Sequence, residues 1–285
     1  IVRRIGLAFA DQFALQRVVL GRDMRLTSPE FAAGLTEILA GCGVDVVDIG
    51  LAGTEEVYYA VQNLETSGVD GGIMITASHN PADYNGMKLV QRGARPVSRD
   101  SGLLEIEQKA ASAAWFRDRL VRASGRQGRY ELALDKSGYV AHLLSFIRPE
   151  RLAPLKLVVN SGNGCAGPVV DLLAPHLPFT FIRLQHEPDG TFPHGVPNPL
   201  LPDRREATAS AVREHRADLG IAWDGDFDRC FFFDETGRFI EGYYLVGLLA
   251  QRALKRHQGG KIIHDPRLVW NTEEIAKDPN KVAQL

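Results

Sequence analysis

Short apolar runs alternate with longer amphipathic stretches in the first part of the chain. Strands are expected at Arg17–Gly21, Val44–Ile49 and Val69–Thr76, and helices at Pro29–Ala40 and Thr54–Leu64. Ser28 precedes the first of these helices and is expected to be its N-cap, because a serine side chain accepts hydrogen bonds from free helix N–H groups. This strand and helix order predicts an α/β fold with a largely parallel or mixed sheet.

The same alternation returns in the second half of the chain. Strands are expected at Leu155–Asn160, Phe179–Leu184 and Asp218–Asp224, with a helix at Pro168–Leu173. A long helical stretch, Ser101–Arg122, and a segment rich in Gly and Arg, Gly125–Arg129, separate the two halves. We therefore expect consecutive α/β domains with mixed sheets at residues 1–130 and 131–238, and a partial third domain at residues 239–285.

Composition narrows the functional class. The 285 residues carry a net charge of -2, so no broad basic field supports binding to nucleic acid or to an anionic membrane. Cys42, Cys165 and Cys230 are widely spaced without a C-x-x-C pair, which argues against a disulfide framework and a zinc site. With neither a targeting segment nor a spanning run in the sequence, we expect a cytoplasmic protein, of an oligomeric state that the sequence leaves open.

The predicted strand Val69–Thr76 leads into a polar turn that carries a hydroxyl group. Residues 76–81 are Thr-Ala-Ser-His-Asn-Pro, and residues 84–88 are Tyr-Asn-Gly-Met-Lys. Loops that follow buried strands often hold reactive groups, which makes Ser78 a candidate nucleophile. Ser, Asn and Pro also favour ordinary turns, so this motif alone leaves both interpretations of Ser78 open.

A second polar loop follows the predicted strand Asp218–Asp224. It contains Asp224, Asp226 and Asp228 at alternating positions and then Arg229. Three such carboxylates repel one another unless a cation lies among them, and oxygen ligands favour Mg²⁺, Ca²⁺ or Mn²⁺. An EF-hand is one alternative, but Arg229 stands where that loop needs Gly and the flanks predict strands. A metal-free, solvated acidic turn is the other alternative.

Arg229 extends this metal site into a candidate anion site. A guanidinium binds a phosphate group through two parallel hydrogen bonds, and Lys88 in the other loop offers a second cation. Ser78 and Asp224 belong to different α/β units, so we expect an active site where the two units meet.

The two loops resemble those of the α-D-phosphohexomutase family, which includes phosphomannomutases, phosphoglucomutases and phosphoglucosamine mutases. In that family the T-A/G-S-H-N-P loop carries the serine that becomes phosphorylated, and D-G-D-x-D-R is the Mg²⁺ loop that faces it. Gly21–Arg25, with the sequence GRDMR, is similar to the G-R-D-x-R that follows the family's first strand. The resemblance covers roughly residues 1–272 and is strongest to the bacterial phosphomannomutase branch.

The resemblance implies a reaction and a cofactor. The expected reaction interconverts mannose 6-phosphate and mannose 1-phosphate, and possible further substrates are glucose phosphates. It would run through phospho-Ser78 and a hexose 1,6-bisphosphate, which also serves as the activator. The resemblance assigns Mg²⁺ to Asp224, Asp226, Asp228 and an oxygen of phospho-Ser78.

The resemblance also implies roles for neighbouring residues. Arg229 and Lys88 would stabilise the transferred phosphoryl group, and either Lys88 or His79 would move the proton of the sugar hydroxyl. His79 has a second interpretation, in which it only orients the loop. Asn80 would hold the turn near the substrate. Arg22 would either face the substrate or form a surface ion pair.

Three segments of the family pattern are missing from this sequence. The chain begins after the family's Tyr-Asp-Ile-Arg-Gly segment, and the sugar-recognising Gly-Glu-x-Ser loop and a later phosphate-binding loop do not follow Thr272. We therefore expect a C-terminally truncated member with two complete domains. The alternatives to a competent mutase are a catalytically impaired, Mg²⁺-binding fragment and a residual Mg²⁺-dependent phosphatase.

Overall fold

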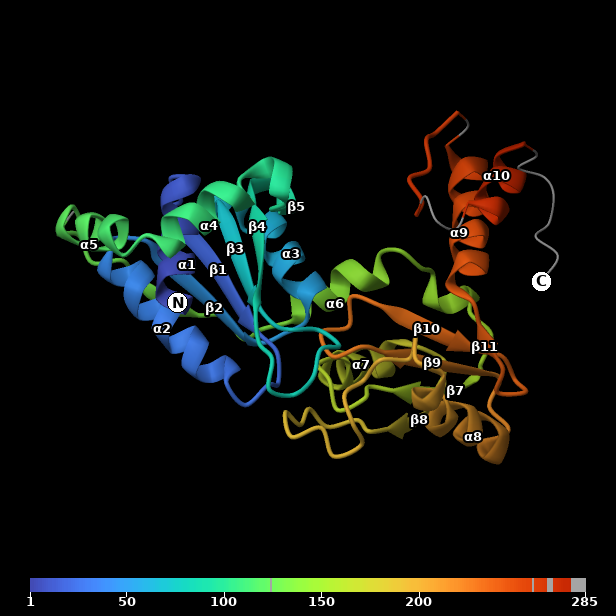
Figure 1. Ribbon diagram of the computed structural model, residues 1–285. Helices are drawn as coiled ribbons and strands as arrows, with labels where there is room; N and C mark the ends of the chain where they lie inside the picture. Colours follow the sequence, from blue (N-terminus) through green and yellow to red (C-terminus); the bar gives the residue numbers. More distant parts are fainter. Residues whose placement is uncertain (124, 258, 266–268, 278–285) are drawn as a thin grey trace.

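The computed structural model describes residues 1–285 except 124, 258, 266–268 and 278–285. Two α/β units lie side by side, and a pair of helices stands on the second unit (Figure 1). Each unit contains a mixed sheet, which confirms the predicted fold class. No helix in these described ranges combines the length and apolar character needed to cross a membrane.

The first sheet has the strand order β5-β4-β3-β1-β2-β6. The strands are β1 (Arg17–Arg22), β2 (Asp45–Leu51), β3 (Gly71–Ile75), β4 (Met87–Gln91), β5 (Arg95–Pro96) and β6 (Tyr130–Leu132). Strands β3, β1, β2 and β6 are parallel, whereas β4 and β5 form an antiparallel edge. The centre of β1 is fully buried on both faces, which explains its unbroken apolar run of Val18, Val19 and Leu20.

Helices cover both faces of this sheet. The helices are α1 (Val2–Gln12), α2 (Ser28–Gly41), α3 (Thr54–Asn63), α4 (Leu103–Ala111) and α5 (Ala113–Val121). One core joins α1, α2 and α4 to the face that carries Val18 and Leu20. A second core joins α3 to the opposite face, through Val57 and Val61 packed near Val19. Among the helices that the structure describes, α3 is the one that contributes residues to this second core.

The second sheet has the order β11-β10-β9-β7-β8. Its elements are β7 (Lys156–Asn160), α7 (Ala166–Leu173), β8 (Thr180–Leu184), α8 (Glu206–His215), β9 (Leu219–Trp223), β10 (Cys230–Phe233) and β11 (Phe239–Ile240). Strands β9, β7 and β8 are parallel, and β10 and β11 are antiparallel. Val212 of α8 packs on one face and Val170 of α7 on the other.

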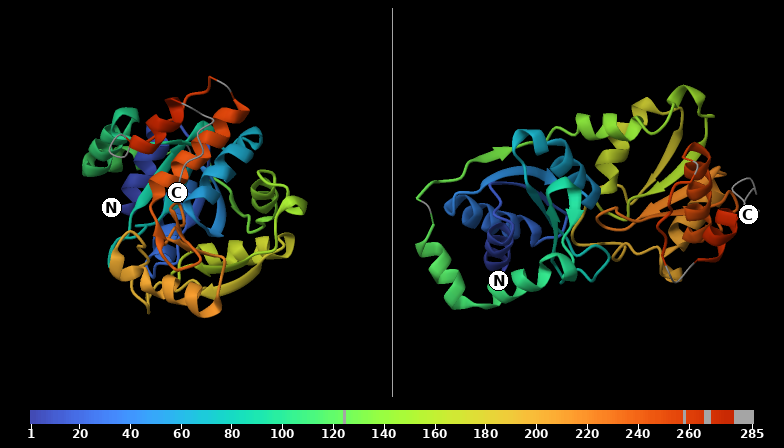
Figure 2. Two further views of the ribbon diagram at one scale, coloured as in Figure 1. Left: turned by 90° about the vertical axis from the view of Figure 1, so that its right-hand side faces the viewer. Right: turned by 90° about the horizontal axis from the view of Figure 1, so that it is seen from above.

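Three helices lie outside the two layered units. Helix α6 (Ser137–Leu144) contacts both α3 and α7, so it bridges the units. Helices α9 (Gly242–Arg256) and α10 (Trp270–Lys277) pack on each other and project from the second unit (Figures 1 and 2). Short 3-10 turns lie at Glu65–Ser67, Arg92–Ala94, Arg99–Ser101, Pro149–Arg151, Ala174–His176 and Pro202–Arg204.

The sheets continue slightly past the predicted domain boundaries. Strand β6 begins at Tyr130 and pairs with β2, and β11 begins at Phe239 and pairs with β10. The partition into 1–130, 131–238 and 239–285 stays a prediction. Residues 266–268 and 278–285 of its third part lie outside the described residues.

Two local predictions differ from the structure. Thr27, not Ser28, is the N-cap of α2, and the Ser28 hydroxyl donates to Asp23 Oδ1 at 2.6 Å. The long helix expected at residues 101–122 is divided at Ser112 into α4 and α5. Ser112 is extended and its Oγ accepts from Trp115 N at 3.1 Å, so it caps a new helix instead of continuing the old one.

Candidate active site

Ser78 lies in the turn between β3 and β4, and its backbone is left-handed with φ of +51°. The Ser78 N–H donates to Thr76 Oγ1 at 2.8 Å, and Asn80 N–H donates to Ala77 O at 2.9 Å. A serine adopts this conformation only where its surroundings compensate the strain. The hydrogen bonds of the turn provide this compensation and fix the direction of the Ser78 side chain.

Arg25 supports the same turn through hydrogen bonds, and its side chain is buried, with the residue 1% exposed. Its guanidinium donates to the main-chain carbonyls of Ser78 (3.0 Å), Asn80 (2.7 Å), Pro81 (2.7 Å) and Tyr84 (2.8 Å). Asp23 balances its charge, with 3.3 Å between Arg25 Nε and Asp23 Oδ2. Arg25 is part of the GRDMR motif, but the motif alone predicts no site role for it. The sequence signal is the spacing within that motif, in which Asp23 and Arg25 are two positions apart.

Arg22 and Asn80 were predicted to contact substrate. Arg22 forms an ion pair with Asp48 at 3.5 Å, at the end of β1 that adjoins β2. Asn80 has an exposed side chain, while its main chain belongs to the hydrogen-bonded turn. An ion pair was one of the two interpretations of Arg22, but Asp48 is buried, so the pair is not one between two exposed side chains; substrate contact by either residue stays a prediction.

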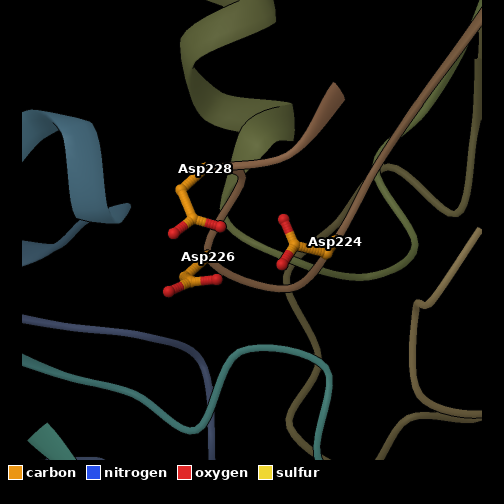
Figure 3. A group of neighbouring side chains, drawn as sticks. All are labelled: Asp224, Asp226 and Asp228. Carbon is orange, nitrogen blue, oxygen red and sulfur yellow. The ribbon is translucent and has the colours of Figure 1, made fainter. Parts of the chain in front are cut away.

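The three aspartates lie in the loop between β9 and β10. Each offers a carboxylate oxygen, and these oxygens lie within 4.8 Å of one another (Figure 3). Asp224 and Asp226 are fully buried, whereas Asp228 is exposed. Strands flank the loop on both sides, so it lacks the two helices of an EF-hand.

The aspartate loop and the serine turn meet directly. Ser78 Oγ donates to Asp224 Oδ2 at 2.7 Å, and Arg229 Nη2 donates to Ser78 Oγ at 2.8 Å. A Cβ atom on Gly225 would lie 2.8 Å from Ser78 O, so glycine permits this close approach. The expected meeting of the two units at Ser78 and Asp224 is therefore present in the structure.

Lys88 reaches the aspartates from β4. Its Nζ donates to Asp226 Oδ2 and Asp228 Oδ2, both at 2.6 Å, and to Thr54 Oγ1 at 2.9 Å. Burial alone would lower the pKa of Lys88, but the negative charges of Asp226 and Asp228 outweigh it and raise the pKa. Lys88 is therefore positively charged at neutral pH and reduces the repulsion within the cluster.

His79 lies against both Ser78 and Arg229. Its Nδ1 is 3.2 Å from Ser78 Oγ and 2.5 Å from Arg229 Nη2. A guanidinium only donates hydrogen bonds, so Nδ1 is the acceptor and the ring proton lies on Nε2. Burial and the charge of Arg229 lower the pKa of His79, which keeps the ring neutral at neutral pH.

The aspartate cluster fits a hard divalent cation. Burial, and then the charge of Asp226, raise the pKa of Asp224 to about 7, as expected for carboxylates crowded together without a metal. Asp226 Oδ1 is buried and has no hydrogen-bond partner in the described part of the chain. A buried carboxylate oxygen without a donor is costly unless a cation satisfies it. An all-carboxylate donor set suits Mg²⁺ or Mn²⁺.

Thr54, at the start of α3, is a site residue that sequence reasoning missed. Its hydroxyl donates to Asp226 Oδ2 at 2.7 Å, and its N–H donates to Asp226 O at 3.0 Å. The sequence carries no signal for this contact beyond the start of a predicted helix, because 172 residues separate the two partners.

Both units of the chain match models of one known protein family. Residues 1–116 match the family model "Phosphoglucomutase/phosphomannomutase, alpha/beta/alpha domain I", and residues 137–237 match domain II of the same family. The chain is 57% identical to a Xanthomonas campestris pv. campestris protein named "Phosphohexose mutases", over 100% of this chain and 62% of that protein. It is 54% identical to a phosphomannomutase of Salmonella typhimurium, over 95% of this chain and 59% of that protein.

A solved structure shows the same arrangement. The crystal structure of a phosphoglucomutase/phosphomannomutase family protein from Burkholderia thailandensis superimposes with a TM-score of 0.86 and 33% sequence identity. The match covers 98% of this chain and 60% of that one. The chain thus spans about 60% of the length of the relatives that it matches.

Proposed function

We propose that this chain, which belongs to the phosphoglucomutase/phosphomannomutase family, transfers a phosphoryl group between Ser78 and a hexose phosphate. The observation that carries the proposal is the contact of Ser78 Oγ with both Asp224 and Arg229. A hydroxyl beside a guanidinium and a carboxylate cluster suits phosphoryl transfer, because catalysis of this reaction depends on positioning and charge stabilisation. The names of its relatives favour mannose 6-phosphate and mannose 1-phosphate as the substrate pair, with glucose phosphates as further candidates.

The proposed reaction has two half-steps. First, the 1-hydroxyl of a hexose 6-phosphate attacks the phosphorus of phospho-Ser78, the bond from phosphorus to Oγ breaks, and hexose 1,6-bisphosphate forms. The bisphosphate then turns over, and Ser78 Oγ attacks the phosphorus of its 6-phosphate. Hexose 1-phosphate leaves and phospho-Ser78 is restored. In each half-step the attacking hydroxyl loses one proton and the departing oxygen gains one, so charge and protons balance.

Arg229 and Lys88 supply positive charge in this proposal. Arg229 already donates to Ser78 Oγ, so its guanidinium is placed to hold the oxygens of a phosphoryl group on that atom. Lys88 contributes a second charge at Asp226 and Asp228. Asp224, Asp226, Asp228 and a phosphoserine oxygen would hold Mg²⁺, whose charge neutralises that of the transferred group.

Lys88 and His79 are the candidates for proton transfer. The raised pKa of Lys88 keeps it protonated and charged but far from the operating pH at which a general acid works best, so it favours charge stabilisation over proton donation by Lys88. The lowered pKa of His79 keeps it neutral, which suits a proton acceptor, although its Nδ1 already accepts from Arg229. Of the two side chains, His79 therefore has the pKa that better suits proton transfer.

The test is conversion of mannose 6-phosphate in the presence of Mg²⁺ and catalytic glucose 1,6-bisphosphate, followed by ³¹P NMR. We expect mannose 1-phosphate to accumulate with the wild-type chain and not with Ser78→Ala. Ser145→Ala, which removes an exposed hydroxyl of α6's C-cap, is the matched control and should leave the rate unchanged. Equal rates for Ser78→Ala and wild type would refute the proposal.

A second candidate function follows from the chain's coverage of its relatives, which is about 60% of their length. The chain could hold Ser78 and the metal site without completing the sugar site. In that case mass spectrometry would find Ser78 phosphorylated by glucose 1,6-bisphosphate, while no mannose 1-phosphate forms. Release of inorganic phosphate in the same samples would instead identify a Mg²⁺-dependent phosphatase, because water replaces the sugar hydroxyl.

A further inference from the structure

The two carboxylate oxygens of Asp226 have different surroundings. Oδ2 accepts from Thr54 Oγ1 at 2.7 Å and from Lys88 Nζ at 2.6 Å. Oδ1 is buried and has no partner in the described part of the chain. The protein therefore occupies one oxygen of Asp226 and leaves the other available, and Asp226 belongs to the cluster of three carboxylates (Figure 3).

Thr54 determines which oxygen is left available. Its hydroxyl accepts from Lys88 Nζ at 2.9 Å, so the hydroxyl proton points toward Asp226 Oδ2. Its N–H also donates to Asp226 O at 3.0 Å. The main chain and the side chain of Asp226 are thus both fixed by the same residue, which restricts rotation of the carboxylate.

The start of α3 is itself held firmly. Glu56 Oε2 accepts from Gly53 N–H at 2.8 Å, and Lys136 Nζ lies 2.6 Å from Glu56 Oε1. Lys136 belongs to the connection between the two units and also donates to Leu51 O at 2.8 Å. The ring of Phe227, next to Asp226, packs where a Cβ atom of Gly53 would stand. Thr54 is therefore attached to a rigid support and not to a free loop.

We infer that Thr54 is a positioning residue that turns Asp226 Oδ1 toward a divalent cation. The inference rests on the metal centre of the proposed function and adds to it a residue from the first unit that acts through Asp226. Residues that hydrogen-bond metal ligands fix the ligand's orientation, and their loss weakens metal binding. Without the hydroxyl, the carboxylate of Asp226 can rotate and lose this alignment.

Mn²⁺ titration tests the inference without relying on turnover. The full chain is titrated with Mn²⁺, and free Mn²⁺ is measured by electron paramagnetic resonance. Thr54→Val keeps the shape and the main-chain N–H but removes the hydroxyl, and it should raise the Mn²⁺ dissociation constant about 10-fold. Thr54→Ser keeps the hydroxyl and should remain within about twofold of wild type. Thr54→Ala also removes the hydroxyl and should match Thr54→Val, so a folding failure of one variant does not stop the test.

Thr208→Val is the matched control. Thr208 is as buried as Thr54, at 1% against 3% exposed, and its hydroxyl accepts from Asn160 Nδ2 at 3.0 Å, so its recorded partner is an amide and not a carboxylate of the cluster. Its replacement should leave Mn²⁺ affinity unchanged. Wild-type affinity in Thr54→Val and Thr54→Ala, or an equal loss in Thr208→Val, would overturn the inference alone. Absence of Mn²⁺ binding by the wild-type chain would overturn both the inference and the proposed metal centre.

Discussion

Arg229 donates a hydrogen bond to the hydroxyl oxygen of Ser78 at 2.8 Å, although 151 residues separate them in the sequence. The same guanidinium donates to His79 Nδ1 and lies 3.3 Å from Asp224 Oδ2. One side chain of the second unit therefore contacts the serine turn of the first unit and a carboxylate of its own loop. The chemistry that we propose depends on both contacts being present together.

Arg229→Lys tests this double contact. A lysine ammonium is a compact charge and cannot reproduce the planar guanidinium, whose Nη2 contacts Ser78 and His79 while its Nε lies beside Asp224. We expect the rate of Ser78 phosphorylation by glucose 1,6-bisphosphate to fall about 10²-fold, measured by quenched-flow mass spectrometry. Arg238→Lys, at an exposed ion pair with Asp234, should retain the wild-type rate. An unchanged rate in Arg229→Lys would show that positive charge alone is sufficient.

Arg25→Met tests how the serine turn is held. The replacement removes the donors of four main-chain carbonyls and leaves Asp23 buried without its counter-charge. Breaking a buried ion pair from one side costs about 3–5 kcal/mol, so the free energy of unfolding in urea should fall by that order. Arg92→Met removes an exposed partner of Glu65 and should cost less than about 1 kcal/mol. Similar costs for the two variants would contradict the supporting role of Arg25.

The sequence predicted the reactive and metal-binding residues of this site better than the residues that hold them in place. Ser78 follows the buried strand β3 and the three aspartates follow the half-buried strand β9, both in recognisable motifs. The loops after these strands meet in the structure. Arg25 was missed as a site residue because its partners are main-chain carbonyls, and the GRDMR motif that contains it does not show what it binds. Thr54 was missed because its contact depends on how the two units pack. Side chains that act through tertiary contacts are visible only when the fold is known.

The predicted ends of two helices were wrong for a similar reason. Residues 101–122 have helical spacing throughout, but the chain turns at Ser112, where the serine side chain caps α5. At α2, the predicted cap Ser28 instead bonds Asp23, because Asp23 organises the support of the serine turn. In both places a hydroxyl had two possible partners, and the pattern of apolar positions does not distinguish them.

The raised pKa of Asp224 predicts a dependence of stability on pH. Burial and the charge of Asp226 raise it to about 7 from an ordinary value of 3.8. Between these values the folded, metal-free protein keeps a proton that the unfolded chain has lost. The stabilisation that comes from this proton on Asp224 is therefore complete below about pH 4 and is lost as pH rises through 7. We expect the unfolding free energy of wild type, relative to Asp224→Asn, to decrease from pH 5 to pH 8 in EDTA.

The comparison with Asp224→Asn removes an opposing contribution of His79 to the pH dependence of stability. The lowered pKa of His79 means that His79 adds stability as pH rises toward its ordinary value of 6.5. Both proteins retain His79, so its contribution is largely removed in the difference. Adding Mg²⁺ should stabilise the wild type more at pH 8 than at pH 5, because a proton competes for Asp224 at the lower pH. A pH-independent difference in EDTA would contradict the shifted pKa of Asp224.

Gly225→Ala tests whether the close approach of the two loops is required. The new Cβ atom would lie 2.8 Å from Ser78 O and 3.1 Å from the Met24 side chain. Met24 can shift, but the Ser78 carbonyl is held by Arg25, so the aspartate loop must move instead. Displacement by about 1 Å costs about 10²-fold in rate, and we expect that loss in Ser78 phosphorylation.

Gly41→Ala is the control for this replacement. A Cβ atom on Gly41 meets nothing within 4 Å, and the residue lies in the last turn of α2. Its replacement should stabilise the protein by up to about 1 kcal/mol and leave phosphorylation unchanged. If Gly225→Ala kept the wild-type rate while folding normally, the contact between the loops would not limit phosphoryl transfer. A loss of rate with an unchanged unfolding free energy would instead assign Gly225 to the geometry of the reaction, because a general folding defect would lower both.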